Sequence, residues 1–221
     1  MRAEGPVTWS LVVPVKLLAR AKTRLAALAG PVRPALALAV AADTVCAALD
    51  CPRVRHVIVV TDDGLAGTEL ARLGAVVVGD EPDAGLNPAL AHGAAVAVAR
   101  DPRSGVGALS ADLPALRATE LDRALRQAGR WPQAIVPDAA GLGTTLYTAR
   151  PGVPFRPRFG PGSRLRHIAA GAHEITPDDM PGLRRDVDTA ADLGEAALLG
   201  LGPATAPLAA RLLRGRGAVP S

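Results

Sequence analysis

The chain has 221 residues, a length that suits one domain with a sizeable core, and 49% of them are hydrophobic, which excludes global disorder. Aromatic residues make up only 2%, so few platforms for stacking bases are available. The formal net charge is +4 without any run of basic residues, which favours small acidic ligands over nucleic acid.

The beginning of the chain lacks a secretion signal, because residues 1–8 contain no charged segment followed by an apolar run. The apolar stretch 34–49 is rich in alanine and interrupted by Asp43, so we interpret it as a largely buried helix and not as a membrane span. Cys46 and Cys51 are the only cysteines, and no CxxC or Cys/His pattern accompanies them. These features predict a cytoplasmic protein that contacts no membrane.

The first predicted strand, 9–15, leads into the only two lysines of the chain, Lys16 and Lys22, whereas the other basic residues are arginine. A lysine acts as a point charge beside phosphate. Together with Arg24, the lysines would follow the carboxyl end of the strand, where open α/β sheets bind their ligands. A solvated basic loop is the alternative interpretation.

Strands and helices then alternate. Apolar, β-branched runs predict strands at 54–61, 75–78, 106–110 and 133–136, and helical patterns cover 34–49, 65–73, 89–100 and 119–128. This rhythm predicts an α/β fold with a doubly wound, mostly parallel sheet. After residue 137 it breaks into a turn, a strand at 144–148, a loop at 151–162 and a helix at 190–199, so we expect a short irregular insertion. We expect one domain over 1–214 and a frayed tail at 215–221.

The loop predicted at 79–88 contains Asn87 directly before a helix. Its amide would either cap that helix or, at the mouth of the sheet, read the edge of a base.

Three acids follow predicted strands or extended segments. Asp112 lies just past the strand at 106–110, and Asp186 and Asp188 are two residues apart, so in an extended segment they point to the same side. Hard oxygen ligands that converge from two segments suit one or two magnesium ions bridging phosphates. Asp188 also stands before Thr189 and a helix, which leaves a helix cap as the alternative.

Two glycine-rich segments supply hydrogen-bond donors. Residues 141–145 offer flexible backbone and two hydroxyl groups, and residues 159–164 open a predicted helix with Gly, Ser and Arg. Their structural alternatives are a hairpin turn and a capped helix. The four histidines show no metal-ligand spacing and are expected at the surface or in packing. No Ser/His/Asp or Cys/His nucleophile is evident, which fits direct transfer between two bound phosphates.

In their order, these motifs resemble the phosphoenolpyruvate and 2-phospho-L-lactate guanylyltransferases of coenzyme F-420 biosynthesis. The resemblance extends over about 11–208. Its motifs are Pro14-Val15-Lys16, Ala21-Lys22-Thr23-Arg24-Leu25, Leu86-Asn87, Ala111-Asp112-Leu113-Pro114, Arg158-Phe159-Gly160-Pro161, Asp186-Val187-Asp188-Thr189 and Gly202-Pro203-Ala204-Thr205.

The resemblance implies a nucleotidyltransferase-type sheet and transfer of GMP from GTP to the phosphate of phosphoenolpyruvate, with release of pyrophosphate. The implied magnesium ligands are Asp112, Asp186 and Asp188. The implied contacts to the GTP phosphates come from Lys16, Lys22 and Arg24, of which Lys22 and Arg24, together with Asp112, would be catalytic. Asn87 would lie near the guanine. The carboxylate of the three-carbon acid would be held by Thr144, Gly160 and Ser163.

One departure concerns the glycine-threonine motif, which often reads Gly-Thr-Gly-Thr in relatives but Gly141-Leu142-Gly143-Thr144-Thr145 here. Thr145 is therefore an alternative to Thr144. The acceptor could also be 2-phospho-L-lactate. Three further interpretations stay open: a nucleotidyltransferase acting on another phosphate, a metal-dependent glycosyltransferase and a non-catalytic nucleotide-binding module.

Overall fold

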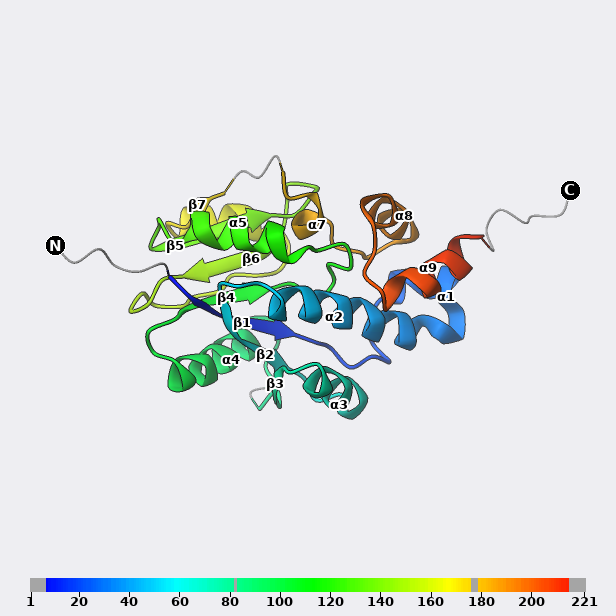
Figure 1. The fold of residues 1–221 in the computed structure, drawn as a ribbon, viewed down its shortest axis with the longest axis horizontal. Helices are drawn as coiled ribbons and strands as arrows, with labels where there is room; N and C mark the ends of the chain where they lie inside the picture. Colours follow the sequence, from blue (N-terminus) through cyan, green and yellow to red (C-terminus); the bar gives the residue numbers. More distant parts are fainter. Residues whose placement is uncertain (1–6, 82, 176–178, 215–221) are drawn as a thin grey trace, which may run out of the picture.

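A computed structural model describes residues 7–81, 83–175 and 179–214, whose strands form one seven-stranded sheet (Figure 1). The spatial order is β3-β2-β1-β4-β6-β5-β7. Strand β6 runs antiparallel to both of its neighbours, and the other described pairs are parallel, which confirms the predicted mostly parallel sheet. The strands are β1 (Trp9–Pro14), β2 (Val54–Val60), β3 (Val76–Val78), β4 (Gly105–Leu109), β5 (Gln133–Pro137), β6 (Thr144–Ala149) and β7 (His173–Glu174).

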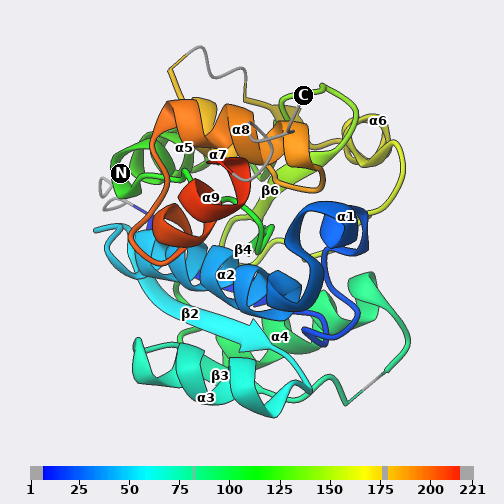
Figure 2. The same cartoon turned by 90° about the vertical axis from the view of Figure 1, so that its right-hand side faces the viewer.

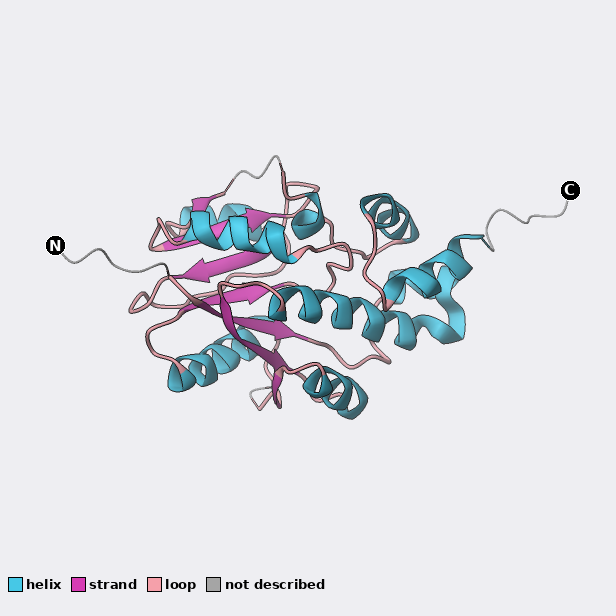
Figure 3. Cartoon of the chain, in the orientation of Figure 1, coloured by secondary structure: helices cyan, strands magenta, loops and turns pink. Residues whose placement is uncertain are grey.

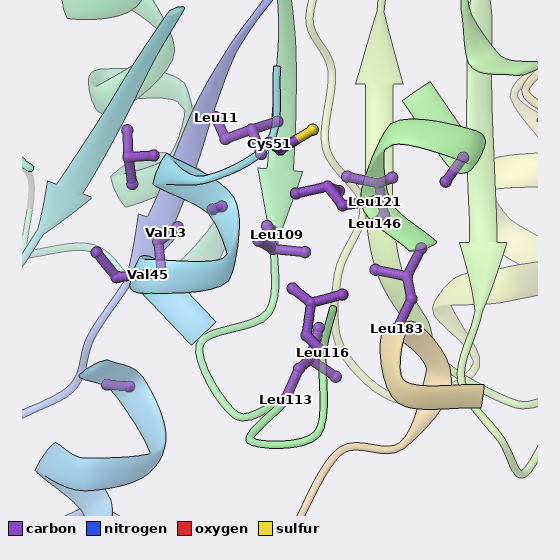
Figure 4. Packing of buried hydrophobic residues seen from close by; sticks show 14 of the residues in the cluster. Leu11, Val13, Val45, Cys51, Leu109, Leu113, Leu116, Leu121, Leu146 and Leu183 are labelled. Carbon is purple, nitrogen blue, oxygen red and sulfur yellow. The ribbon is translucent and has the colours of Figure 1, made fainter. Parts of the chain in front are cut away.

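Helices cover both faces of the sheet, as Figures 1 and 3 show. Leu11 and Val13 of β1 pack into a core with α2 (Arg33–Leu49), α3 (Gly64–Arg72) and α5 (Ala118–Ala128), part of which is drawn in Figure 4. Val12 points to the opposite face and packs against α4 (Leu86–Arg100). Because side chains alternate along a strand, an apolar run of this kind fills two cores at once. The doubly wound arrangement is therefore confirmed.

A third cluster of buried residues lies at one end of the molecule. It joins α1 (Ala26–Ala29), α2, α8 (Ala190–Leu199) and α9 (Thr205–Arg214), and Figure 2 shows α9 between α8 and α2. The buried Asp43 of α2 accepts hydrogen bonds from the backbone N–H groups of Ala204 and Thr205 at 3.0 and 2.8 Å. A Cβ at Gly202 would collide with the Asp43 side chain. The motif at 202–205 therefore attaches the start of α9 to α2.

Several boundaries differ from the sequence prediction. Helix α4 begins at Leu86, so Asn87 and Pro88 lie in its first turn, where proline is tolerated because the first N–H groups have no partner within the helix. The segment after Lys22, predicted as a loop, contains the 3₁₀ turns η1 (Thr23–Leu25) and η2 (Gly30–Val32) around α1. Helix α9 was not predicted, and 215–221, the predicted tail, lies outside the described residues.

One helical stretch of the described residues, Thr23–Leu49, is long and apolar enough to cross a membrane by length and composition. Its α2 part packs on the sheet, with Ala37, Ala41 and Val45 buried against β1 and β2 strand residues. Burial in the core accounts for its apolar composition, in agreement with the predicted buried helix.

The remaining helices lie beside β5 and β6. They are α6 (Ser163–Ala169) and α7 (Pro181–Arg184).

Candidate active site

A cleft of about 340 Å³ opens at the carboxyl ends of β1 and β4. The segment after β1 supplies Lys16, Lys22 and Arg24 to its wall, and Asp112 enters after β4. Asp188 and Leu86 reach the cleft from elsewhere in the chain. The cleft lies where ligands bind to open α/β sheets, and the predicted basic and acidic motifs do meet there.

The ammonium group of Lys22 lies between two carboxylates. Its Nζ is 2.7 Å from Asp112 Oδ2 and 3.2 Å from Asp188 Oδ1, and the Lys22 side chain is only 10% exposed. Burial lowers the pKa of Lys22, but the two aspartates outweigh it, and the net pKa is raised. Lys22 is therefore charged, and it forms ion pairs with two of the three acids predicted to bind metal.

The backbone around Lys22 is held in an uncommon shape. Lys22 has φ 54°, a left-handed conformation that costs a non-glycine residue roughly 1–2 kcal/mol. Arg33 fixes the preceding turn, since its guanidinium donates to the carbonyl groups of Ala19 and Ala21. Asp63, which caps α3, accepts the N–H of Leu18 at 2.8 Å. Sequence reasoning missed Arg33 and Asp63, because they act on the loop from separate helices.

Lys16 and Arg24 differ from Lys22 in exposure. Both side chains are exposed at the wall of the cleft. They are therefore accessible to a bound anion, whereas Lys22 is engaged with Asp112 and Asp188.

The segment that carries the DxD pair is anchored to the strand end that carries Asp112. The N–H of the fully buried Val187 donates to the Asp112 carbonyl at 3.0 Å. Burial, followed by repulsion from Asp112, Asp138 and Asp188, raises the pKa of Asp186 to about 6. The three predicted acids are thus close enough for their charges to repel. Among the described residues, however, no three His, Cys, Asp or Glu side chains are grouped closely enough to hold a metal.

Asp188 is not a helix cap, so the structural alternative for it is wrong. Helix α8 is capped by Thr189, whose side chain accepts the N–H of Asp192 while the Asp192 carboxylate accepts the Thr189 N–H. This capping box satisfies the start of the helix. The Asp188 carboxylate is left to face Lys22 and the cleft.

A second group of predicted residues meets between β6 and α6. Ser163 Oγ donates to Thr144 Oγ1 at 3.2 Å, and both residues are buried. The neighbouring Thr145 instead faces the carbonyl of Val136 at 3.5 Å. Of the two threonines, Thr144 is therefore the one that lies in the same hydrogen-bonded group as Ser163. Neither Thr144 nor Ser163 is among the residues that line the cleft.

His167, expected only at the surface or in packing, organises this second group. Its Nε2 accepts the Arg158 N–H at 2.8 Å, and its Nδ1 lies 3.1 Å from Thr144 Oγ1. Burial, followed by the charge of Arg166, lowers its pKa to about 4, so the ring is neutral and its proton is on Nδ1. The available signal was its position four residues after Ser163, on the same face of α6.

The two glycine-rich segments match their structural interpretations in part. Residues 138–143 form the β5–β6 turn, where the Asp138 carboxylate accepts the N–H groups of Leu142 and Gly143. Gly160 has φ 120°, a conformation that requires glycine. Arg164 forms a two-pronged ion pair with Glu174 at 2.6 and 2.9 Å, so its charge is neutralised locally.

Asn87 neither caps α4, which begins after Gly85, nor points an unengaged amide into the cleft. Its Nδ2 donates to the Phe159 carbonyl at 3.1 Å, and its Oδ1 accepts the Phe159 N–H at 2.8 Å. The cap interpretation is wrong, and both polar atoms of the amide are engaged by the backbone of one residue, Phe159.

The fold and the cleft together define a nucleotidyltransferase-type protein. The chain superposes on a nucleotidyl transferase from Methanothermobacter thermautotrophicus with TM-score 0.54 (17% identity, 94% of this chain and 99% of that chain). A protein from Mycobacterium tuberculosis solved as a complex with manganese matches with TM-score 0.50 (21% identity, 86% and 97% coverage). At these identities the likeness establishes the fold.

The sequence identifies the family. The chain belongs to the CofC-like guanylyl transferases, whose family model matches residues 9–212. A phosphoenolpyruvate guanylyltransferase from Thermomonospora curvata is 66% identical over 95% of this chain and 92% of that protein. One from Streptomyces coelicolor is 60% identical over 93% and 97%. The predicted family and enzyme class are confirmed: the chain is a nucleotidyltransferase.

Proposed function

We propose that this enzyme transfers GMP from GTP to the phosphate of phosphoenolpyruvate and releases pyrophosphate. The observation that carries the proposal is the cleft, which brings three cations of the β1 segment within reach of two aspartates from distant segments. The reaction class follows from the family. Because fold and family are those of soluble enzymes, we place the reaction in the cytoplasm.

The cations of the cleft would bind the triphosphate. Lys16 and Arg24 are exposed on its wall and suit the outer phosphates, while the Lys22 side chain is only 10% exposed and lies beside Asp112. A phosphate oxygen of the acceptor attacks the α-phosphorus in line, and the bond to the bridging oxygen of pyrophosphate breaks. No general base is required, because a phosphate monoester is largely ionised near neutral pH. Lys22 and Arg24 would stabilise the charge on the leaving pyrophosphate.

The three predicted acids, all among the described residues, are not grouped closely enough to hold a metal as they stand, so they would have to move together around a divalent cation. Asp112, Asp186 and Asp188 offer the hard oxygen ligands that magnesium and manganese prefer. Burial, followed by repulsion from the neighbouring carboxylates, raises the pKa of Asp186. A cation held by them would neutralise phosphate charge in the transfer. We propose Mg²⁺ as that cation. Binding it requires Lys22 to leave the carboxylates, and the ammonium is then available to the triphosphate.

The hydroxyl group of Thr144 would bind the carboxylate of the acceptor. Thr144 Oγ1 accepts from Ser163 and from the Nδ1–H of neutral His167, so its own proton is left to donate. Gly160 would contribute backbone next to this group, in a conformation closed to other residues. The site for the acid is therefore neutral and built from hydroxyl groups.

Phosphoenolpyruvate is the acceptor that the relatives favour. Proteins named phosphoenolpyruvate guanylyltransferase match this chain at 48% to 66% identity. The family supports guanylyl transfer and does not support the glycosyltransferase alternative. 2-Phospho-L-lactate shares the carboxylate and the phosphate and differs at the central carbon, so it is the competing substrate to test.

The test is pyrophosphate release by the purified enzyme with MgCl₂ and GTP, with phosphoenolpyruvate and 2-phospho-L-lactate supplied separately. We expect release with phosphoenolpyruvate, a product whose mass equals the acid plus GMP minus water, and no comparable reaction with ATP. Release that depends only on 2-phospho-L-lactate would replace the acceptor. Release with neither acid would overturn the proposal.

A further inference from the structure

The segment 155–160, between β6 and α6, is held by side chains from three different elements. The Arg156 N–H donates to Tyr147 Oη of β6 at 3.3 Å, and the Arg158 N–H donates to His167 Nε2 of α6 at 2.8 Å. The Phe159 N–H donates to Asn87 of α4 at 2.8 Å. Two of these attachments come from β6 and α6, which carry the site proposed for the carboxylate of the acceptor (the acid site). The third comes from α4, the helix beside the cleft.

The attachment to α4 is the most specific of the three. Asn87 pairs with both the N–H and the carbonyl of Phe159, across 72 positions of the chain. Only a carboxamide offers a donor and an acceptor side by side in this way. An aspartate would set a carboxylate oxygen against the Phe159 carbonyl, and an alanine would leave both peptide groups without these partners.

The pair joins the two halves of the site. Leu86, the residue before Asn87, lines the cleft, and Gly160, the residue after Phe159, is the glycine proposed to contribute backbone to the site of the acid. The Phe159 ring packs against the core cluster that includes Ala89 and Leu90 of α4, and it meets the His167 ring edge-on at a centroid distance of 5.2 Å. A shift of the first turn of α4 therefore moves the segment that contacts His167.

We infer that Asn87 is a positioning residue that couples nucleotide binding in the cleft to acceptor binding beside Thr144. The inference rests on the proposed function. Filling the cleft fixes the start of α4, and the Asn87–Phe159 pair passes that constraint to segment 155–160. The nucleotide-bound enzyme then binds the acid more tightly, and by linkage the acid-bound enzyme binds the nucleotide more tightly.

The coupling is measured as the ratio of the Kd of phosphoenolpyruvate without and with a saturating GTP analogue whose α–β bridge is methylene. We expect a ratio above about fivefold for the wild type. In Asn87→Ala the ratio falls toward one, and the Kd of the analogue alone changes less than about twofold. The matched control is Tyr147→Phe, which removes another attachment of the same segment but keeps the link to α4, so its ratio stays near that of the wild type.

Two results would overturn the inference. One is an unchanged ratio in Asn87→Ala. The other is a large loss of analogue affinity in Asn87→Ala together with a loss of preference for guanine over adenine, because that pattern identifies Asn87 as a residue that reads the base.

A substrate-free experiment separates this inference from the choice of acceptor. In Asn87→Asp the new carboxylate lies in the first turn of α4, where the favourable helix dipole offsets its repulsion from the Phe159 carbonyl, so we expect little change in Tm. The same variant should raise amide hydrogen exchange in 155–160 about tenfold. A purely structural role for Asn87 predicts that Tm and protection fall together, and unchanged exchange shows that the pair does not hold the segment. Neither readout depends on the identity of the acid.

Discussion

The cleft and the group beside β6, which we propose as the two halves of the site, are built from different kinds of polar groups. In the cleft, Lys22 lies between Asp112 and Asp188, and Asp186 feels the charge of its acidic neighbours. Beside β6, Thr144, Ser163 and His167 form a buried and neutral hydrogen-bonded group. In the cleft, a bound cation and triphosphate would replace the present ion pairs of Lys22. Beside β6, the hydroxyl and imidazole groups are already oriented by their hydrogen bonds.

This difference agrees with what each half is proposed to bind. A triphosphate and a divalent cation bring several charges, which are stabilised best by groups that can rearrange around them. A carboxylate brings one charge and a fixed shape, and preoriented donors bind it without reorganisation. Substitutions in the cleft should therefore change turnover strongly, and substitutions beside β6 should change mainly stability or the KM of the acid.

The largest effect is expected for Asp188→Asn. The change removes one carboxylate of the proposed cation site and one partner of Lys22, and we expect turnover to fall on the order of a thousandfold. The fold should survive, because α8 is capped by Thr189. Steady-state rates and a thermal melt check both points. Glu195→Gln is the matched control, since Glu195 lies on α8, pairs with Arg185 outside the cleft and is 55% exposed. Rates like those of the wild type in Asp188→Asn would refute the metal assignment.

Lys22→Ala should separate cation binding from catalysis. Without the ammonium group, Asp112 and Asp188 lose their shared partner, so we expect the substrate-free enzyme to bind Mn²⁺ more tightly. Turnover should fall about a hundredfold, because the phosphates lose a point charge. Free Mn²⁺ is followed by electron paramagnetic resonance. Lys22→Arg retains the positive charge, and its Mn²⁺ affinity should stay near that of the wild type. Equal or weaker Mn²⁺ binding in Lys22→Ala contradicts the idea that the two cations compete.

The neutral half should respond to pH through His167. Its pKa is lowered from 6.5 to about 4 in the folded protein, so the unfolded chain binds the proton more readily. The free energy of unfolding therefore falls as the pH drops from about 6.5 to 4, by up to about 3 kcal/mol from this residue. Urea titrations across that range check the slope. His167→Gln lacks the titrating group and should give a flatter profile, and identical slopes in both proteins would show that His167 is not held neutral.

Much of the molecule was predictable from local pattern. Apolar, β-branched runs located the strands from β1 to β5, and the positions of Lys22, Asp112 and Asp188 after strands or extended segments placed them in one cleft. The position of β6 between β4 and β5 was not predictable. The turn between β5 and β6 predicts that these two strands pair, but it does not predict which strand pairs with the other edge of β6.

The partners of buried polar groups were the least predictable feature. Asp43 interrupts an apolar helix in the sequence. It attaches α9 through the N–H of Thr205, a residue 162 positions further along the chain. His167 and Asn87 likewise act through backbone groups of segment 155–160, and every residue type except proline presents the same N–H and carbonyl. Side-chain chemistry marks a candidate, but only the fold selects the backbone group that it binds.

The smallest effect tests the neutral half at a single hydroxyl group. Thr144→Val removes the group proposed to donate to the acid, and we expect the KM of phosphoenolpyruvate to rise about tenfold with little change in kcat or in the Kd of GTP. Thr145→Val is the matched control. Its hydroxyl group meets only the Val136 carbonyl, at 3.5 Å, and valine fits a buried strand position of the same size, so its KM should stay within about twofold of the wild type. Initial rates over a range of acid concentrations decide between the two. If Thr145→Val raises the KM and Thr144→Val does not, the acid is bound from the other face of β6, because successive residues of a strand point to opposite sides of the sheet.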